Sequence, residues 1–164
     1  TADSKESQDI CFIPDGDYRS FVAEHVTLEP GDIVDTDGNI LGRHRGLALY
    51  TVGQRQGLGL ASGERRYVLG LDAASNRLIA GSEEQLLSSR LTAAELNWVA
   101  GRAPEGPDIT AKIRYKSADV PVELRFRDDA AEVYFGQPQR AVAPGQAVVF
   151  YRDETVLGGG IIEA

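Results

Sequence analysis

From residue 92 to its end, the chain is a series of short apolar segments separated by turn residues. The segments run from LTAAELNWV to GQAVVFYRDETVLGGGIIEA, and glycine, proline or paired aspartates lie between them. Five or six such segments at near regular spacing predict a small closed β-barrel or a β-sandwich. In AKIRYKS, the apolar Ala111 and Ile113 alternate with Lys112 and Arg114, so a strand here would have one buried and one basic face.

The first half of the chain predicts a smaller β unit preceded by a helix. DIVDTDGNILG and YVLGLDAASNRLIAG each place a turn between two apolar runs, which is the pattern of a hairpin. The stretch between them predicts a short helix or strand over residues 47–52, followed by an ordered glycine-rich loop. EEQLLSSR predicts a weak helix or a turn. Tyr18, Phe21, Val22 and His25 are at helical spacing and predict one short amphipathic helix.

The predicted fold class is therefore mainly β. A chain of 164 residues can hold one ordinary domain or two small ones. We expect a short helical segment over residues 1–25, a small central β domain over residues 26–91 and a C-terminal β-barrel over residues 92–164.

Charge is unevenly distributed along the chain. The net charge is -8, but residues 1–40 carry ten acidic and two basic side chains, so the remainder is balanced. Two stretches are locally basic, namely residues 41–70 with five arginines and residues 111–127 with five lysines and arginines. Such stretches suit contacts with phosphate, although charge alone favours ordinary solvated strand faces.

Several kinds of site are excluded by the sequence. Two distant histidines and one cysteine do not form a metal site, and no metal is expected. GQRQGLGLASG lacks the strand and helix context of a dinucleotide site, and LGGGIIEA lacks the lysine and hydroxyl residue of a phosphate loop. A serine hydrolase triad has no local support. No apolar run approaches the roughly 20 residues that span a bilayer, and one cysteine forms no internal disulfide, so we expect a cytoplasmic protein without a membrane partner.

The single cysteine, Cys11, lies in ESQDICFIP between polar turn-forming residues and a short apolar run. An isolated cysteine between isoleucine and phenylalanine is more often an inert buried residue. A loop that leads into a buried strand is also a place where a reactive thiol can lie beside a cleft. The pattern alone leaves both interpretations open.

The order of the motifs resembles that of the bacterial tRNA-specific 2-thiouridylase family. The resemblance covers essentially the whole chain, and SQDICFI and GQRQGLG are its most specific blocks. It corresponds to the C-terminal part of that enzyme. The absence of methionine, even at position 1, also suggests a fragment. The resemblance thus implies that residues 1–25 are a remnant of the family's α/β catalytic domain, which is ATP-pyrophosphatase-like and carries the phosphate loop.

The resemblance implies transfer of sulfur to C2 of the wobble uridine in tRNAs for lysine, glutamate and glutamine. In the family, ATP is the co-substrate that adenylates the uridine, and a cysteine persulfide then delivers the sulfur. Cys11 matches the persulfide cysteine, which ends in a disulfide with a partner cysteine of the missing domain. A sulfur-donor protein is also implied. This part of the enzyme would bind no cofactor itself and would be inactive alone.

The resemblance also implies tRNA docking by the two β domains. Arg114 and Tyr115 match a tRNA-contacting pair, and Gln146 matches a third contact; Arg55 is a weaker candidate. Strand packing for Tyr115 and a turn hydrogen bond for Gln146 are the structural alternatives. Alternation places Arg114 and Tyr115 on opposite faces, so both reach one rim only if a bulge or the end of the strand falls here. Glu132 is expected on a solvent face.

Two other functions compete with the enzymatic one. The chain could be a non-catalytic RNA-binding β-barrel module whose cysteine is structural, or a β-barrel interaction domain without a nucleic-acid role. Persulfidation of Cys11 would support only the enzymatic interpretation. Binding of an anticodon stem-loop would separate both RNA-related interpretations from the third.

Overall fold

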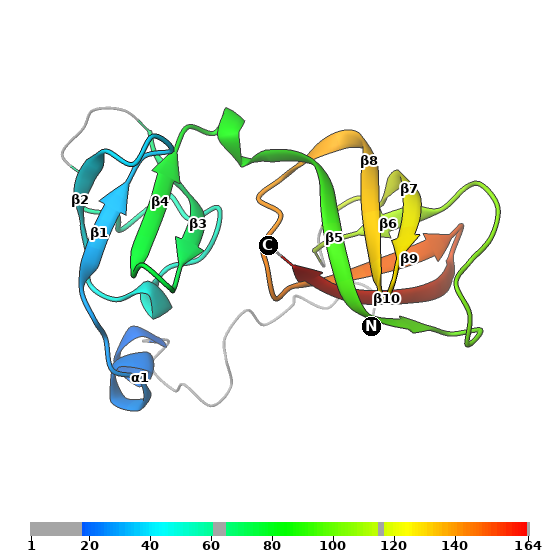
Figure 1. Ribbon diagram of the computed structural model, residues 1–164, viewed down its shortest axis with the longest axis horizontal. Helices are drawn as coiled ribbons and strands as arrows, with labels where there is room; N and C mark the ends of the chain where they lie inside the picture. Colours follow the sequence, from blue (N-terminus) through cyan, green and yellow to red (C-terminus); the bar gives the residue numbers. More distant parts are fainter. Residues whose placement is uncertain (1–17, 61–64, 115–116, 164) are drawn as a thin grey trace, which may run out of the picture.

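A computed structural model describes residues 18–60, 65–114 and 117–163, which form two β domains (Figure 1). These residues contain one α-helix, two short 3-10 helices and ten strands. The helix α1 (Tyr18–His25) lies where the spacing of apolar residues predicted it. The prediction of a mainly β protein is confirmed.

The first domain is a four-stranded sheet with the order β2-β1-β4-β3. Its strands β1 (Gly31–Val34) and β2 (Ile40–His44) form one antiparallel hairpin, and β3 (Tyr67–Asp72) and β4 (Arg77–Gly81) form another. Both predicted hairpins are therefore present. The central strands β1 and β4 run parallel and join the hairpins into one sheet.

Each hairpin turn is closed by an aspartate that accepts hydrogen bonds from the turn itself. Asp35 accepts from the backbone N–H groups of Asp37 (3.0 Å) and Asn39 (2.8 Å), and from Nδ2 of Asn39 (2.9 Å). Asp72 accepts from the backbone and hydroxyl of Ser75 in the same way. The bonds from Asn39 hold the pKa of the Asp35 carboxyl below its ordinary value, because they stabilise the ionised form.

Replacing Asn39 with alanine should raise the pKa of Asp35 toward 3.8, because the side-chain donor is lost. A folded-state pKa below the unfolded one gives stability that is present above the unfolded pKa and is lost as the pH falls through the folded pKa. The variant should lose that contribution at a higher pH than the wild type. A pH titration of the Asp35 carboxyl carbon by NMR measures the shift. Ser75→Ala, which acts on Asp72, is the control, and an unchanged Asp35 pKa would contradict the assignment.

A long loop connects β2 to β3, and its middle is hydrogen-bonded to β3. It begins with the 3-10 helix η1 (Leu47–Leu49), so the helical alternative for residues 47–52 is confirmed. Its middle is fixed by backbone hydrogen bonds from Gly53 to Val68 (2.8 Å) and from Val68 to Gln54 (2.9 Å). The buried core of this domain consists of Ile33, Tyr50, Leu58, Val68, Leu78 and Ala80. The loop therefore contributes two core residues.

The second domain is a closed barrel of six antiparallel strands in the order β10-β5-β8-β7-β6-β9, with β9 paired to β10. The 3-10 helix η2 (Glu84–Leu86) leads directly into it, so the first strand begins earlier than the predicted LTAAELNWV segment. The strands are β5 (Leu87–Trp98), β6 (Thr110–Lys112), β7 (Val120–Arg127), β8 (Ala130–Arg140), β9 (Ala147–Arg152) and β10 (Thr155–Glu163). The predicted closed barrel is confirmed.

The glycine run of β10 lets the neighbouring strands approach closely. A Cβ placed on Gly158 would lie 2.3 Å from the carbonyl oxygen of Asn97, and one on Gly160 would lie 2.6 Å from that of Ala94. Any side chain at either position would collide with the backbone of β5. The glycines of LGGGIIEA therefore allow β10 to pack against β5 and close the barrel.

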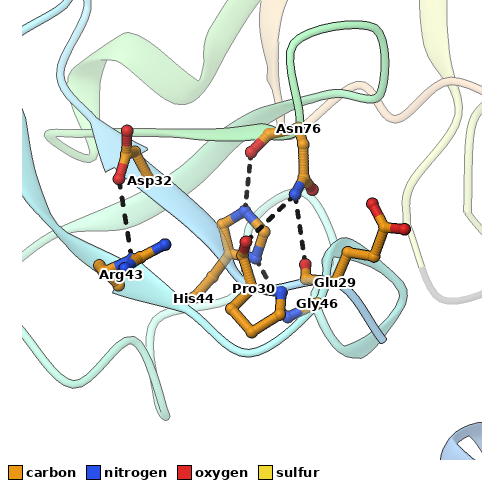
Figure 2. Close-up of polar contacts among 7 residues, drawn as sticks. All are labelled: Glu29, Pro30, Asp32, Arg43, His44, Gly46 and Asn76. Carbon is orange, nitrogen blue, oxygen red and sulfur yellow. Dashed lines mark hydrogen bonds and ion pairs between the residues drawn. The ribbon is translucent and has the colours of Figure 1, made fainter. Parts of the chain in front are cut away.

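A buried histidine ties three segments of the first domain together (Figure 2). His44 is only 1% exposed. Its Nδ1 accepts from the N–H of Gly46 (3.1 Å), so its Nε2 is the donor to the carbonyl of Asn76 (3.1 Å). The Nδ2 of Asn76 donates in turn to the carbonyls of Glu29 and Pro30 (3.3 Å each). The neutral imidazole thus joins the entry to β1, the end of β2 and the turn before β4.

His44→Phe should lower the free energy of unfolding by about 1–3 kcal/mol, because it fills the space but leaves a buried N–H and a carbonyl without their partner. The other histidine, His25, is exposed on α1, and its replacement by phenylalanine should change stability by about 0.5 kcal/mol or less. Urea unfolding of both variants measures the difference. If both variants lost the same free energy of unfolding, the hydrogen bonds of His44 would contribute nothing measurable to stability.

Candidate nucleic-acid interface

Two of the predicted site residues lie outside the described part of the chain. Cys11 precedes the first described residue, and Tyr115 falls between residues 114 and 117. Their predicted roles stay predictions. Arg114 and Gln146 are both described, and each lies at the edge of the barrel.

Arg114 follows the end of a strand. β6 ends at Lys112, Ile113 is 6% exposed, and Arg114 is exposed in the bend that follows. The bend is closed by Ser117, whose N–H (3.2 Å) and hydroxyl (2.9 Å) donate to the carbonyl of Arg114. The predicted alternation of buried and basic residues is confirmed up to this point. The strand ends before the predicted contact pair, as one of the two reconciling geometries requires.

The guanidinium of Arg114 binds backbone atoms of a distant segment. Its Nη2 donates to the carbonyl oxygens of Arg140 and Ala141, which lie at the end of β8. A charged donor on two carbonyls makes hydrogen bonds stronger than neutral ones. Arg114 therefore fixes the backbone where the barrel meets the first domain.

Ala141 is one of the residues at which the two domains touch. It is 3% exposed and forms a small cluster with Tyr67 and Leu86. Its N–H donates to the carbonyl of Leu86 (2.8 Å). A Cβ placed on Gly53 would lie 2.8 Å from the Cβ of Ala141, so the loop of the first domain lies directly against it. We call this contact the junction.

The side chains of Arg140, Glu83 and Tyr67 interact with one another beside the junction. Arg140 Nε lies 3.3 Å from Glu83 Oε1, and its guanidinium lies 5.2 Å from the centre of the Tyr67 ring. The hydroxyl of Tyr67 donates to Oε2 of the same glutamate (3.3 Å). An exposed ion pair alone contributes little, but here one arginine joins a carboxylate and an aromatic face from the other domain.

Gln146 lies at the far end of the segment that Arg114 holds. Its carbonyl accepts from the N–H of Ile162 (2.8 Å), and the N–H of Gly145 donates to the carbonyl of Ile162 (2.8 Å). The side chain of Gln146 is exposed. Residues 141–146 are thus fixed by Arg114 at one end and by β10 at the other, and both described contact candidates border this segment.

Glu132 lies on the face of β8 opposite to the buried Ala131 and Val133, where alternation predicted it, but it is only partly exposed. Its side chain is 23% exposed, Oε2 accepts from the hydroxyl of Tyr134 (3.0 Å), and Oε1 lies 3.4 Å from Nε of Arg127. Alternation along β8 predicts the face of a residue but not its partners, so the contacts of Glu132 with Tyr134 and Arg127 could not be predicted. Sequence reasoning also missed the backbone partners of Arg114, which lie 26 and 27 residues along the chain.

The comparisons with known proteins match both domains. A family model described as a tRNA methyl transferase PRC-barrel domain matches residues 19–82, and one described as an aminomethyltransferase β-barrel domain matches residues 88–162. The first match thus covers the four-stranded sheet, and the second covers nearly all of the closed barrel.

Curated relatives identify the family more narrowly. The tRNA-specific 2-thiouridylase MnmA of Magnetococcus marinus is 51% identical over 164 residues, which cover 96% of this chain and 45% of the relative. The MnmA proteins of Carboxydothermus hydrogenoformans and Dehalococcoides mccartyi are 45% and 47% identical, over 99% and 97% of this chain and 46% and 45% of their own lengths. The chain belongs to the tRNA-specific 2-thiouridylase family and spans about half the length of the curated relatives it matches. Among the described residues, no helix has the length and apolar character needed to cross a membrane.

Proposed function

We propose that this chain supplies the persulfide cysteine and the tRNA docking surface of a tRNA 2-thiouridylase. The observation that carries the proposal is the identity to 2-thiouridylases along essentially the whole chain, which includes Cys11 and the segment around Arg114. The proposed substrates are the tRNAs for lysine, glutamate and glutamine, and a separate protein donates the sulfur. We further propose a cytoplasmic location.

In the proposed reaction, Cys11 carries a terminal sulfur as a persulfide. That sulfur attacks C2 of the activated uridine, a C2–S bond forms, and the C2 oxygen leaves with its activating group. The thiolate of a second cysteine then attacks the Sγ of Cys11, which breaks the S–S bond, leaves sulfur on C2 and forms a disulfide between the two cysteines. This chain has a single cysteine, so the second one belongs to the rest of the protein.

The residues of this chain do not fit ATP. The sequence has neither the lysine and hydroxyl pattern of a phosphate loop nor the Ser-Gly-Gly-x-Asp-Ser loop of the family. We therefore assign uridine activation to the part of the relatives that this chain does not span. The work of this chain is to hold the sulfur and to bind the RNA.

Arg114 and Gln146 suit RNA docking because they border one fixed segment of the barrel edge. The Nη2 of Arg114 is committed to two carbonyls, while Nε and Nη1 carry further N–H donors that suit a phosphate. The exposed amide of Gln146 can contact a base edge or a ribose hydroxyl. Tyr115, next to Arg114, is the proposed stacking residue.

In the full-length enzyme, Cys11→Ser should abolish thiolation and leave tRNA affinity within about a few-fold. A hydroxyl cannot carry a persulfide, whereas the loss of one sulfur atom barely changes a contact surface. Single-turnover thiolation and a tRNA filter-binding assay measure the two quantities. Normal turnover in the variant would make the cysteine structural and favour a non-catalytic RNA-binding barrel.

Arg114→Ala should weaken tRNA binding by roughly 1–3 kcal/mol and flatten its salt dependence, because a charge-assisted contact is lost. It should also loosen residues 140–146, since two carbonyls lose their donor. Arg114→Lys should recover part of the affinity but not the rigidity, because an ammonium lacks the planar fork. Titration of affinity against salt, together with amide hydrogen exchange, separates the effects. Arg102→Ala, at an exposed barrel loop, is the control, and an equal loss of affinity there would contradict a defined contact.

A further inference from the structure

A short loop of the first domain, residues 57–59, lies between two arginine-lined hollows. One hollow of about 770 Å³ has Arg43 and Arg45 in its lining, and the other, of about 300 Å³, has Arg55, Arg65 and Arg66. All three loop residues line both hollows. We call this loop the ridge; it has arginines on both sides, two in one hollow and three in the other.

The ridge is firmly anchored and carries no exposed side chain. Leu58 is 6% exposed and packs in the core of the domain. Gly57 and Gly59 have φ angles of 80° and 67°, a conformation that glycine adopts without strain. A Cβ on Gly59 would meet no atom within 4 Å, so the space above the backbone is open. A ligand can approach the main chain itself here.

Four of the flanking arginines, Arg43, Arg45, Arg55 and Arg65, keep their charge available to a ligand. Among the residues that the structure describes, no carboxylate forms an ion pair with Arg45, Arg55 or Arg65. Arg43 lies 3.9 Å from Asp32 and its side chain is 72% exposed, so this pair is loose and solvated. Unpaired guanidinium groups on an otherwise acidic chain create a local positive potential.

The ridge belongs to the β2–β3 loop, which also contacts the barrel. The same loop contacts Ala141 through Gly53, and the carbonyl of Ala141 binds Arg114. Arg55 follows Gly53 by two residues. The loop that carries Arg55 is therefore the same loop that packs against the residue held by Arg114.

A third hollow has the opposite character. It has a volume of about 700 Å³ and lies between the two domains. Its lining contains three carboxylates and one arginine, namely Asp72, Glu132, Glu163 and Arg90. Phosphate groups would be repelled there, so this hollow does not compete with the ridge for a polyanion.

We propose that the ridge and its flanking arginines bind the phosphate backbone of RNA, as a second contact besides the barrel edge. This inference rests on the proposed function and extends it to the first domain. Arginine forks bind phosphate in a bidentate manner, and a bare backbone allows close approach. RNA is favoured over an acidic protein, because the ridge has no exposed aromatic or aliphatic side chain to serve as the centre of a protein interface.

The test compares two double variants of this chain by fluorescence anisotropy with an unmodified transcript of a glutamate-accepting tRNA. Arg45→Gln/Arg55→Gln removes one charge on each side of the ridge. Arg102→Gln/Arg152→Gln removes the same charge from the hollow at the other end of the barrel. The first variant should bind about tenfold more weakly near 0.1 M salt, with a salt slope smaller by roughly 1.5, while the control keeps the wild-type slope. Arg45→Lys/Arg55→Lys should keep most of the slope.

Each alternative outcome has a distinct meaning. Equal losses in the two glutamine variants would overturn the ridge as a site and leave the barrel contacts standing. A wild-type chain without measurable tRNA affinity would overturn the proposed docking function, and this inference with it. If the ridge variant lost affinity for polyglutamate but not for tRNA, the partner would be an acidic protein and the RNA assignment would be wrong.

Discussion

The contact at Ala141 determines how the two β domains are joined. Every group of this residue is used, because its N–H binds Leu86, its carbonyl accepts from Arg114 and its Cβ lies against Gly53. Its φ angle of 51° is unfavourable for a residue with a side chain. The contacts offset that strain, and together they fix the segment that leads to Gln146. The geometry of the proposed RNA-binding edge thus depends on one small residue that has no polar side chain.

Local charge, more than net charge, determines where a polyanion can approach this protein. Acidic side chains are concentrated in residues 1–40, whereas residues 41–70 are rich in arginine. Charges are screened over about 8–10 Å at physiological salt, so a ligand at the surface responds to the nearest groups. The ridge with its flanking arginines and the hollow with its three carboxylates lie on the same molecule and favour opposite ligands. A net charge of -8 is therefore compatible with the proposed RNA partner.

Features that depend on local chemistry could be predicted from the sequence. The hairpins follow from turns that Asp35 and Asp72 close within a few residues, and the buried face of β6 follows from alternation alone. Features that depend on contacts between residues far apart in the sequence could not be predicted from it. The parallel pairing of β1 with β4 has no local signal, and nothing around His44 in the sequence shows that it would be buried against Asn76. The partners of Arg114 belong to the same class, since the barrel must close before they meet.

Arg114 connects the two aspects of the structure, the junction and the proposed RNA edge. A guanidinium has five N–H donors, and the two carbonyls at the junction engage only Nη2. A side chain held in this way has already lost much of its rotational freedom, so a phosphate that binds the remaining donors incurs a smaller entropic cost. The same two carbonyls belong to the segment that packs against the first domain. In the proposed docking role, a phosphate on Arg114 would therefore act directly on Ala141, the residue that packs against the β2–β3 loop of the first domain.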